Sequence, residues 1–495
     1  MKEFEEILRQ IDWGKPPWKQ IREEIIRLNE KLESSKELEA LENGLSGGYI
    51  EPGPSGLITR GRDDVLPTGR NFYSLDPYRV PTSTSFKIGK KLAEDVIEKF
   101  LKEEGKFPES VGFVWMANDI MWADGEGMAQ IMWFLGVKPL WNSNGRLKGF
   151  EVVPLEELKR PRIDVTIRVS GIIRDNFPNC IEFLDEVFSC VASLDEDPEW
   201  NFVKKHTDQV KQKLGLTQRQ ASLRIFCAKP GTYQAGTQLA VYASAWKEEK
   251  DLAEVFLFWN GYAYGKGVWG EPKHEEFSAL LENVEVTYNK VVTDEYDLFG
   301  CCCYFGTHGG LTAAARHLSG KKVKAYYGDT RDPSLIRVRD LSEEIRRVVR
   351  SKVLNPKWIE GMKKHGYKGA GDISKKIGRI YGWEATTQEV DDWIFDEIAK
   401  TFVLNEENKE FFKKHNPWAL EEITRRLMEA WKRGLWEPEE EVKEGLKKSF
   451  LEVEGWLEEG IEDIQGDFQG SSIDVIVSQE FEEFFKQIKT SVKEG

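Results

Sequence analysis

Early in the chain the apolar residues switch between helical and strand periodicity, and this alternation restricts the fold more than any other feature. Residues 88–101 carry apolar side chains at helical spacing, whereas residues 111–116 form a short continuous apolar run. A second helical pattern over 128–135 is followed by strict alternation over 162–169 and a third helical pattern over 181–191. This order predicts a largely parallel sheet with helices on its faces, because parallel strands need crossover connections.

The remainder of the chain completes the predicted α/β fold class, with largely parallel sheet layers and flanking helices followed by an α-helical C-terminal region. Short apolar runs at 223–226 and 322–327 predict two more strands. By composition and pattern we divide the chain into a helical lead-in (1–50), an α/β domain with an arginine- and glycine-rich loop (51–200), a mixed α/β domain with a His-Gly-Gly loop (201–340) and a helical region (341–495).

Helix-start signals recur in the last third of the chain. Asn355 and Asn416 each precede a proline, which places a capping side chain before a proline at the first helical position. Thr386 and Glu389 have the spacing of a capping box, so we predict that a helix begins there.

Net charge and hydropathy exclude two classes of partner. The chain has 495 residues and a net charge of −15, which argues against a nucleic-acid-binding protein because such proteins need a basic face. No apolar stretch reaches the roughly 18 residues that span a bilayer. The first residues are acidic and lack an apolar signal core, so we expect a cytoplasmic protein without a membrane span.

Several general catalytic motifs are absent from the sequence. It contains no GxxxxGK[ST] phosphate loop, no GxGxxG that opens a helix after a strand and no HExxH, and Ser55 in Gly53-Pro-Ser-Gly56 does not form a GxSxG nucleophile elbow. The missing phosphate loop predicts that this chain does not hydrolyse ATP by a P-loop mechanism.

Three of the six cysteines are consecutive, at positions 301, 302 and 303. The spacing does not form a CxxC pair of the kind that zinc sites use. Two interpretations stay open for these cysteines, namely small apolar filler and a soft metal ligand.

A glycine-rich loop between residues 51 and 73 carries three arginines, Arg60, Arg62 and Arg70. Guanidinium groups bind carboxylates in a bidentate manner, so the loop is either internally salt-bridged or a site for a polycarboxylate ligand.

A second candidate site combines two carboxylates with a histidine. Asp294, Asp297 and His308 fall within fifteen residues, and glycines follow the histidine. Carboxylates and imidazole bind divalent first-row metals and accept protons, so we predict catalytic roles for all three and metal binding by His308 and Asp297. We expect His308 on a loop before a helix, with a neutral ring; the alternative is that it only shapes the glycine turn.

Glu126 is the third predicted metal ligand. It follows Asp124 and precedes a helical pattern, so the alternative is that these acids only favour the helix N-terminus.

Long motifs of the chain resemble a known family, the large subunit of aerobic cobaltochelatase of the CobN type, and more distantly the H subunit of magnesium chelatase. The similar segments follow in the family's order and cover about residues 51–436. They are 51–82, 148–179, 224–236, 259–267, 308–320, 354–370, 383–393 and 416–436.

The resemblance implies a specific activity. Family members insert a divalent metal into a tetrapyrrole, and separate AAA+ partner subunits hydrolyse the ATP. In cobalamin biosynthesis the metal is cobalt and the macrocycle is hydrogenobyrinic acid a,c-diamide. The resemblance therefore implies that Arg60, Arg62, Arg70, Asn71 and Tyr73 bind the substrate and its carboxylates.

The chain resembles only the C-terminal half of the family's large subunit, which suggests a separate chain carrying the N-terminal half as a further partner. The metal is most simply cobalt, with magnesium or another divalent metal as the alternative. A different class of function also fits, namely a non-catalytic carrier of tetrapyrrole or metal derived from a chelatase.

Overall fold

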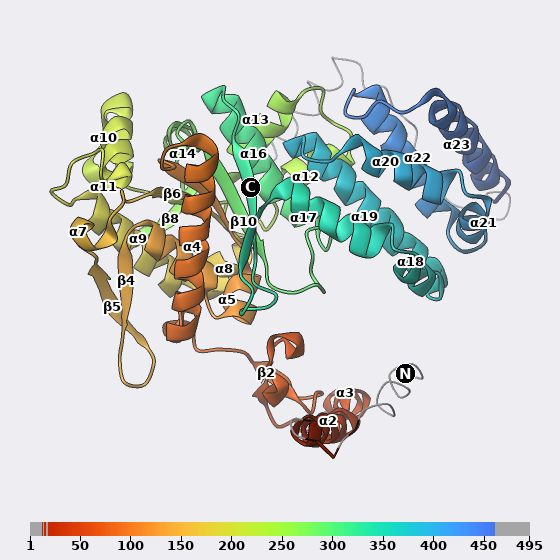
Figure 1. The fold of residues 1–495 in the computed structure, drawn as a ribbon, viewed down its shortest axis with the longest axis horizontal. Helices are drawn as coiled ribbons and strands as arrows, with labels where there is room; N and C mark the ends of the chain where they lie inside the picture. Colours follow the sequence, from red (N-terminus) through yellow and green to blue (C-terminus); the bar gives the residue numbers. More distant parts are fainter. Residues whose placement is uncertain (1–11, 13, 16–17, 461–495) are drawn as a thin grey trace.

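The computed structural model describes residues 12, 14, 15 and 18–460, which form three regions (Figure 1). A small N-terminal lobe, residues 18–79, projects from the rest of the molecule. An α/β body built on one large sheet follows, and residues 341–460 form a helical region beside that body. No helix among these described residues is both long and apolar enough to cross a membrane.

One eight-stranded sheet organises the body, with the strand order β12-β11-β10-β3-β6-β7-β8-β9. Five neighbouring strands, from β11 to β7, run parallel, and antiparallel strands form both edges. The strands are β3 (Ser110–Trp115), β6 (Asp164–Val169), β7 (Ile225–Cys227), β8 (Tyr262–Gly265), β9 (Val268–Pro272), β10 (Val286–Val291), β11 (Lys324–Asp329) and β12 (Arg337–Asp340).

The strand order reverses between β3 and β10. The chain first adds β6 and β7 on one side of β3, then returns to add β10 and β11 on the other side. Sheets of this kind bind ligands in the crevice beyond the carboxyl ends of the strands at the reversal point. The loops after β3 and β10 are therefore the expected ligand-binding segments of this sheet.

Helices cover both faces of the sheet, which confirms the predicted fold class. On one face α4, α6 and α9 pack against Phe113 and Val165, and on the other α13, α14 and α16 pack against Val114 and Phe226. Strands β3, β6 and β10 are buried along their whole length because helices lie on both sides of them.

The remaining elements of the body connect or flank these strands. They are α4 (Ser83–Glu104), α5 (Ala117–Ala123), α6 (Glu126–Phe134), β4 (Val137–Trp141), β5 (Leu147–Val152), α7 (Leu155–Leu158), α8 (Gly171–Asn176), α9 (Pro178–Ala192), α10 (Phe202–Leu214), α11 (Gln218–Ala221), α12 (Thr237–Tyr242), α13 (Glu249–Asn260), α14 (His274–Leu281), α15 (Cys302–Tyr304), η4 (Phe305–Gly309) and α16 (Gly310–Ser319). Each helix and strand predicted between residues 88 and 191 is present within a few residues of its predicted ends.

The sheet contains strands from both sides of the predicted domain boundary between residues 200 and 201. Strand β6 pairs with β7, and β3 pairs with β10, so segments from both predicted domains form one sheet. The boundary fails because parallel pairing joins strands that are distant in sequence, and composition does not record this pairing.

Asp164, the first residue of β6, is the centre of a buried polar network. Asp164 accepts hydrogen bonds from Arg224 at 2.9 Å and faces Nδ1 of His206 at 2.9 Å. The other ring nitrogen of His206 lies 3.3 Å from Glu109. This network ties α10 to the amino end of β6.

The helical region shares its core with the sheet. Ala325 and Tyr327 of β11 pack in the same apolar cluster as Trp383 and Trp436. Its elements are α17 (Leu341–Val348), η5 (Val349–Val353), α18 (Pro356–Lys363), α19 (Gly366–Thr387), α20 (Asp392–Ile398), η6 (Ala399–Val403), α21 (Glu406–His415), α22 (Pro417–Lys432) and α23 (Glu440–Gly460). The predicted helical tail beyond residue 460 lies outside the described residues.

Two of the three helix starts predicted in this region are confirmed. The side chain of Asn355 accepts a hydrogen bond from the backbone N–H of Lys357, and Asn416 accepts one from Ala419. The capping box at Thr386 is wrong, because Thr386 lies inside α19 and donates its hydroxyl hydrogen bond to the carbonyl of Gly382. Packing of the buried end of α19 overrides the local capping signal.

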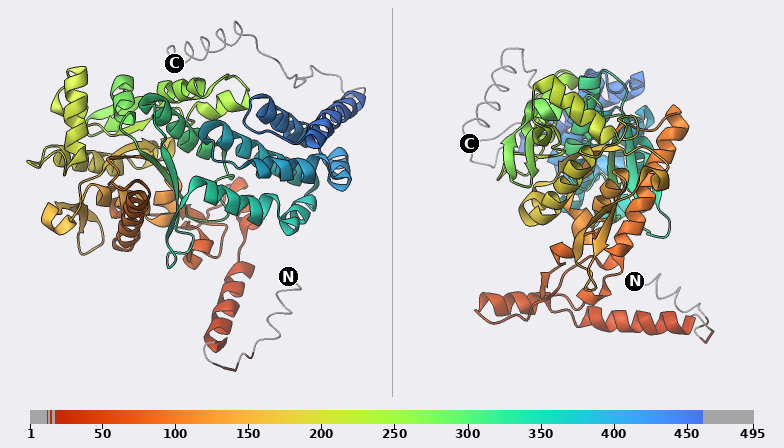
Figure 2. Two further views of the ribbon diagram at one scale, coloured as in Figure 1. Left: turned by 45° about the horizontal axis from the view of Figure 1, so that its top comes forward. Right: turned by 90° about the vertical axis from the view of Figure 1, so that its left-hand side faces the viewer.

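The N-terminal lobe contains two helices and a short two-stranded sheet. Its elements are α2 (Trp18–Glu33), α3 (Glu37–Leu45), β1 (Gly53–Pro54), η1 (Ile58–Arg60), η2 (Asp63–Val65), β2 (Asn71–Tyr73) and η3 (Pro77–Arg79). The predicted lead-in helix is present as α2, but no residue of α2 is buried. The lobe extends away from the body in both views of Figure 2.

Candidate functional site

Charged side chains gather where the strand order reverses. Asp119 and Glu126 follow β3, Lys290 lies near the carboxyl end of β10, and Thr330 follows β11. The topology therefore places acids and bases from separate segments in one crevice.

Glu126 is the centre of a buried ion-pair cluster. One carboxylate oxygen lies 2.7 Å from the guanidinium of Arg60. The other lies 2.7 Å from the ammonium of Lys290 and accepts the hydroxyl of Thr330 at 2.7 Å. Asp119 completes the cluster, with its carboxylate 2.7 Å from Lys290.

This cluster joins a predicted substrate-binding residue to a predicted metal ligand. The Arg60 side chain is 8% exposed and that of Glu126 is 1% exposed, and Arg60 also donates to the backbone carbonyl of Thr330. Both oxygens of Glu126 are already occupied, so in this arrangement the carboxylate anchors the N-terminal lobe to the body. The predicted metal-binding role of Glu126 would require Lys290 or Arg60 to leave first.

Asp294 and Asp297, predicted to be catalytic, lie in the loop after β10 and are also surrounded by cations. Asp294 contacts Arg331 at 2.5 Å and Arg347 at 3.2 Å. Asp297 is fully buried and lies 2.5 Å from the ammonium of Lys352 and 3.1 Å from that of Lys376.

Burial and these ion pairs together shift the pKa values of Asp294 and of Lys376, the partner of Asp297. Burial alone would raise the pKa of Asp294, but the hydrogen bond and charge of Arg331, with the charge of Arg347, outweigh it and hold the pKa below its usual value. Burial lowers the pKa of Lys376, and Asp297 offsets only part of that effect. Asp294 is therefore an anion and a weak base while the arginines remain bound to it.

His308 does not lie on a loop, which corrects the prediction. It belongs to the π-helical turn η4, which continues directly into α16. The ring is fully buried, its Nε2 atom is 3.2 Å from the hydroxyl of Thr287, and its Nδ1 atom has no partner among the described residues. Tyr327 and Trp383 pack against the ring, with centroids 6.0 and 5.7 Å away.

The expected neutral ring has a different cause from the one predicted. Burial lowers the pKa of His308 to about 3, so desolvation keeps the imidazole neutral without a helix terminus. A metal could contact the His308 ring only if the side chains that bury it, such as Tyr327 and Trp383, moved away. The role of His308 in metal insertion stays a prediction.

The other predicted substrate-binding residues lie in the N-terminal lobe. Arg62 forms a bidentate pair with Asp64 at 2.8 and 2.9 Å, as in the salt-bridged interpretation of the loop. Asn71 donates to the backbone carbonyls of Pro54 and Val65, whereas the Tyr73 side chain is 55% exposed.

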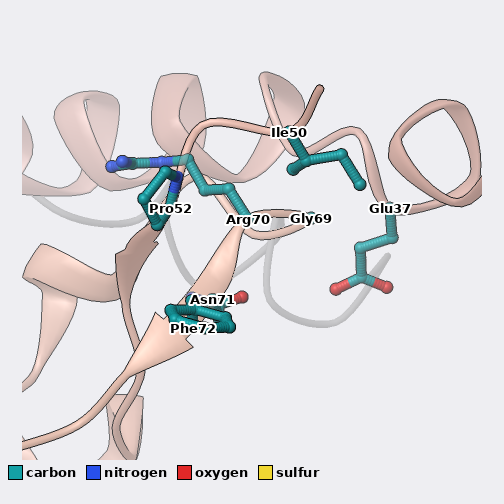
Figure 3. A pocket seen from close by; sticks show the side chains of 7 residues that line it. All are labelled: Glu37, Ile50, Pro52, Gly69, Arg70, Asn71 and Phe72. Carbon is teal, nitrogen blue, oxygen red and sulfur yellow. The ribbon is translucent and has the colours of Figure 1, made fainter. Parts of the chain in front are cut away.

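Arg70 and Asn71 line a pocket of about 420 Å³ on the lobe (Figure 3). Its wall is formed by Glu37, Ile50, Pro52, Gly69, Arg70, Asn71 and Phe72. In the close view Arg70 extends along Pro52, on the side away from the carboxylate of Glu37. The pocket offers one cation, one carboxylate, one amide and apolar side chains to a ligand.

Among the described residues, the three consecutive cysteines are the one group of three or more His, Cys, Asp or Glu side chains whose ligand atoms lie close enough to share a metal ion. Their sulfur atoms all lie within 4.8 Å of one another, and each side chain is half-buried. Cys301 is in extended conformation and precedes α15, where Cys302 and Cys303 lie. The backbone N–H of Cys303 donates to the sulfur of Cys301 at 3.3 Å.

Sequence reasoning missed the cations of this edge. Lys290 lies in the fully buried strand β10, whose sequence VTYNKV mixes apolar and polar residues and gives no clear strand signal. Arg331 lies in the turn after β11, and Arg347, Lys352 and Lys376 lie in helical segments, where charged residues are ordinarily solvent-exposed.

Comparison with known proteins adds independent information. A family model described as CobN/Magnesium Chelatase matches residues 4–443. A Methanocaldococcus jannaschii protein described only as uncharacterized is 61% identical over 92% of this chain and 37% of its own length. The aerobic cobaltochelatase subunit CobN of Pseudomonas aeruginosa is 40% identical over 84% of this chain and 34% of its own length.

Two further similarities involve a magnesium chelatase and a solved structure. The magnesium-chelatase H subunit of Chlorobaculum parvum is 35% identical over 88% of this chain and 34% of its own length. The catalytic subunit of cobaltochelatase from Mycobacterium tuberculosis superposes with a TM-score of 0.82 at 39% identity, over 85% of this chain and 36% of that one. The chain thus spans about a third of the length of the curated relatives it matches.

Proposed function

The chain belongs to the CobN/Magnesium Chelatase family, and from this premise we propose that it acts as a large-subunit component of an ATP-dependent chelatase that inserts a divalent metal into a tetrapyrrole. The family match over residues 4–443 is the observation that carries the proposal. The arginines Arg331 and Arg347 near the point of strand reversal support it, because guanidinium groups suit a macrocycle that carries carboxylates.

We propose cobalt as the metal and a corrin precursor of the hydrogenobyrinic acid a,c-diamide type as the macrocycle, in cobalamin biosynthesis. Identity to the CobN subunit is 40%, compared with 35% to the magnesium-chelatase subunit, and this difference favours cobalt. Magnesium remains the second candidate, because both enzymes belong to the same family.

Metal insertion makes two chemical demands on the protein. The divalent ion must lose bound water, and the two pyrrole N–H groups must release their protons as the metal–nitrogen bonds form. In the proposed mechanism Asp294 and Asp297 serve as the proton acceptors, but in the structure cations occupy both of them.

Substrate binding supplies a way to release one of these carboxylates. A carboxylate of the macrocycle competes with Asp294 for Arg331 and Arg347, both of which reach Asp294 at the partly exposed edge of the crevice. Loss of those two cations raises the pKa of Asp294 and turns it into a better base. Arg70 and the pocket of the lobe offer a second place for the macrocycle.

We propose that AAA+ partner subunits hydrolyse the ATP. The relatives are about three times as long as the matched region, and we propose that a second polypeptide segment supplies the remainder of the large subunit. The test is reconstitution of the purified chain with candidate AAA+ subunits and that segment. Insertion of Co²⁺ or Mg²⁺ is followed by the absorbance shift of the macrocycle. Binding of the macrocycle without insertion under any combination would favour a carrier instead of a chelatase.

A further inference from the structure

The three cysteines before His308 have an arrangement that packing alone does not require. In a strand, Cys301 and Cys303 would lie on one face and Cys302 on the opposite face. Here the chain changes from extended at Cys301 to helical at Cys302, and this bend brings all three sulfur atoms within 4.8 Å of one another.

The spacing of the sulfur atoms suits a metal ion. A tetrahedral thiolate site with metal–sulfur bonds of about 2.3 Å has its sulfur atoms about 3.8 Å apart. Sulfur atoms already within 4.8 Å need to move by only about 1 Å or less to reach that geometry. Three ligands from the protein leave a fourth position open, as in sites that exchange or deliver a ligand.

Two guanidinium groups lie near the sulfur atoms. Arg379 acts electrostatically on Cys301 and Cys302, and Arg168 acts on Cys303. Arg168 donates to the side-chain oxygen of Asn260 at 3.1 Å, and Arg379 donates to the carbonyl of Phe299 at 2.5 Å, while the Nε atom of Arg379 is buried without a partner among the described residues. A nearby guanidinium favours the thiolate form that binds a metal, and the charge of the bound metal itself stabilises three adjacent thiolates.

The cysteine cluster also lies at the edge of the sheet where the carboxyl ends of the parallel strands meet. Arg168 lies near the carboxyl end of β6, opposite Val114 of β3. Asn118, which follows β3, donates to the hydroxyl of Tyr304 at 3.3 Å, one residue after the cysteines. The half-buried cysteines therefore lie at the sheet edge that the proposed function uses.

We propose that Cys301, Cys302 and Cys303 form a binding site for one thiophilic divalent cation, Co²⁺ or Zn²⁺, with an open coordination position. Binding replaces the thiol protons, so the metal displaces up to three protons to solvent as three metal–sulfur bonds form. The site itself does not depend on the chelatase proposal. Only its role as the initial binding site of the metal that is to be inserted rests on that proposed function.

The test uses the purified chain with reduced thiols and with neither tetrapyrrole nor partner subunits. Titration with Co²⁺ under anaerobic conditions is expected to produce a thiolate-to-cobalt charge-transfer band that saturates at one ion per chain. Serine at all three positions (Cys301→Ser, Cys302→Ser, Cys303→Ser) should abolish the band. Because loss of an outer-shell partner alone costs about 10–100-fold in affinity, loss of the ligands should weaken Zn²⁺ binding by at least about 100-fold.

Cys190→Ser is the matched control, since Cys190 is a half-buried cysteine on α9 and outside the cluster. It should leave the band and the affinity unchanged. Alkylation of the unaltered protein gives a second measurement that does not depend on folding of a variant, because Zn²⁺ should protect all three cysteines and not Cys190. Absence of the band, its survival in the triple variant, or equal alkylation with and without Zn²⁺ would each overturn the site. Failure of metal insertion in the reconstituted complex would instead bear on the proposed function.

Discussion

Individual charged side chains at the crevice are mostly bound to one another before any ligand arrives. Glu126 holds Arg60 and Lys290, Asp297 holds two lysines, and Asp294 holds two arginines. Such pairs are costly to break from one side, because the remaining charge stays buried without a partner. A ligand that exchanges one anion for another avoids that cost.

Removal of the charge of Glu126 should destabilise the protein. Glu126→Gln leaves Arg60 and Lys290 without their shared carboxylate, so we expect a loss of about 3–5 kcal/mol in the free energy of unfolding. Urea denaturation followed by tryptophan fluorescence measures it. Glu275→Gln, at an exposed position in α14, is the control and should be neutral. A loss no larger than that of the control would show that the cluster contributes little.

Removal of the arginines beside Asp294 should weaken binding of a carboxylate-bearing tetrapyrrole. Each charged hydrogen bond lost from Arg331→Ala or Arg347→Ala is expected to cost about 1.5–3 kcal/mol of binding free energy. Quenching of tetrapyrrole fluorescence reports the affinity. Arg337→Ala, on the exposed edge strand β12, is the control. Equal affinities for all three variants would mean that these arginines only neutralise Asp294 and Asp329.

At the level of helices and strands, buried polar residues link elements that apolar packing alone would leave less well positioned. His206 on α10 touches Asp164 on β6 and Glu109 just before β3. The π-helical turn η4 places His308 between the sheet and α19. In both places a titratable side chain is part of the core.

The His206 network should make stability depend on pH. Burial alone would lower the pKa of His206, but the hydrogen bonds and charges of Asp164 and Glu109 raise it above its ordinary value of 6.5. A raised pKa in the folded state means that this stabilisation is complete below pH 6.5 and is lost as the pH rises through the folded-state pKa. The stability difference between the unaltered protein and His206→Gln should therefore be larger at about pH 6 than at about pH 9.

Chemical denaturation at the two pH values tests this expectation, with Lys213→Gln on the exposed side of α10 as the control for a surface change in the same helix. A difference that grows with pH would contradict the assigned direction. The same network holds the pKa of Glu109 at about 2, so a second loss of stability is expected as the pH falls from 4.5 towards that value.

Truncation of His308 should affect stability as well as any chemistry. His308→Ala removes a fully buried ring that packs on Tyr327 and Trp383, and we expect a loss of about 2–5 kcal/mol, as for other large-to-small core substitutions. Denaturant unfolding measures this effect. His308→Gln, which retains polar volume, separates packing from chemistry. A role in metal insertion would appear as lost insertion in a variant that is still stably folded.

Considered as a whole, the molecule consists of an α/β and helical body from which a small lobe projects. The cluster of Arg60 and Glu126 and the hydrogen bond from Thr59 to Glu295 at 3.0 Å connect the lobe to the body. Several large apolar side chains of the lobe are exposed, including Leu38, Leu45 and Phe72 at 79%, 82% and 84%. An exposed apolar surface of this size fits an assembly with a further polypeptide segment.

The isolated chain should not hydrolyse ATP. It lacks the phosphate loop of P-loop enzymes, and in the proposed complex the AAA+ subunits carry that activity. A coupled phosphate-release assay on the chain alone, then on the chain with candidate AAA+ subunits, provides the measurement. Turnover by the isolated chain that persists through further purification would contradict this expectation.

Periodicity in the sequence was sufficient to predict the main strands and helices of the body, from α4 to α9, and with them the fold class. The reason is that a strand buried on both faces and a helix buried on one face each need a characteristic spacing of apolar residues. Asn355 and Asn416 were also predictable as helix caps, because a cap depends only on residues within one turn. The family resemblance followed from long local motifs in the same way.

The partners of the candidate site residues depended on tertiary structure. Arg60, Glu126, Lys290 and Thr330 are separated by up to 270 residues; the parallel sheet brings the last three together, and the packing of the lobe on the body adds Arg60. Burial of His308 likewise depends on α19, which the chain forms far downstream. Local sequence records which side chains can ionise, whereas the neighbours that fix their charge come from segments joined by strand order and helix packing, and those neighbours decide what each ionisable group can do.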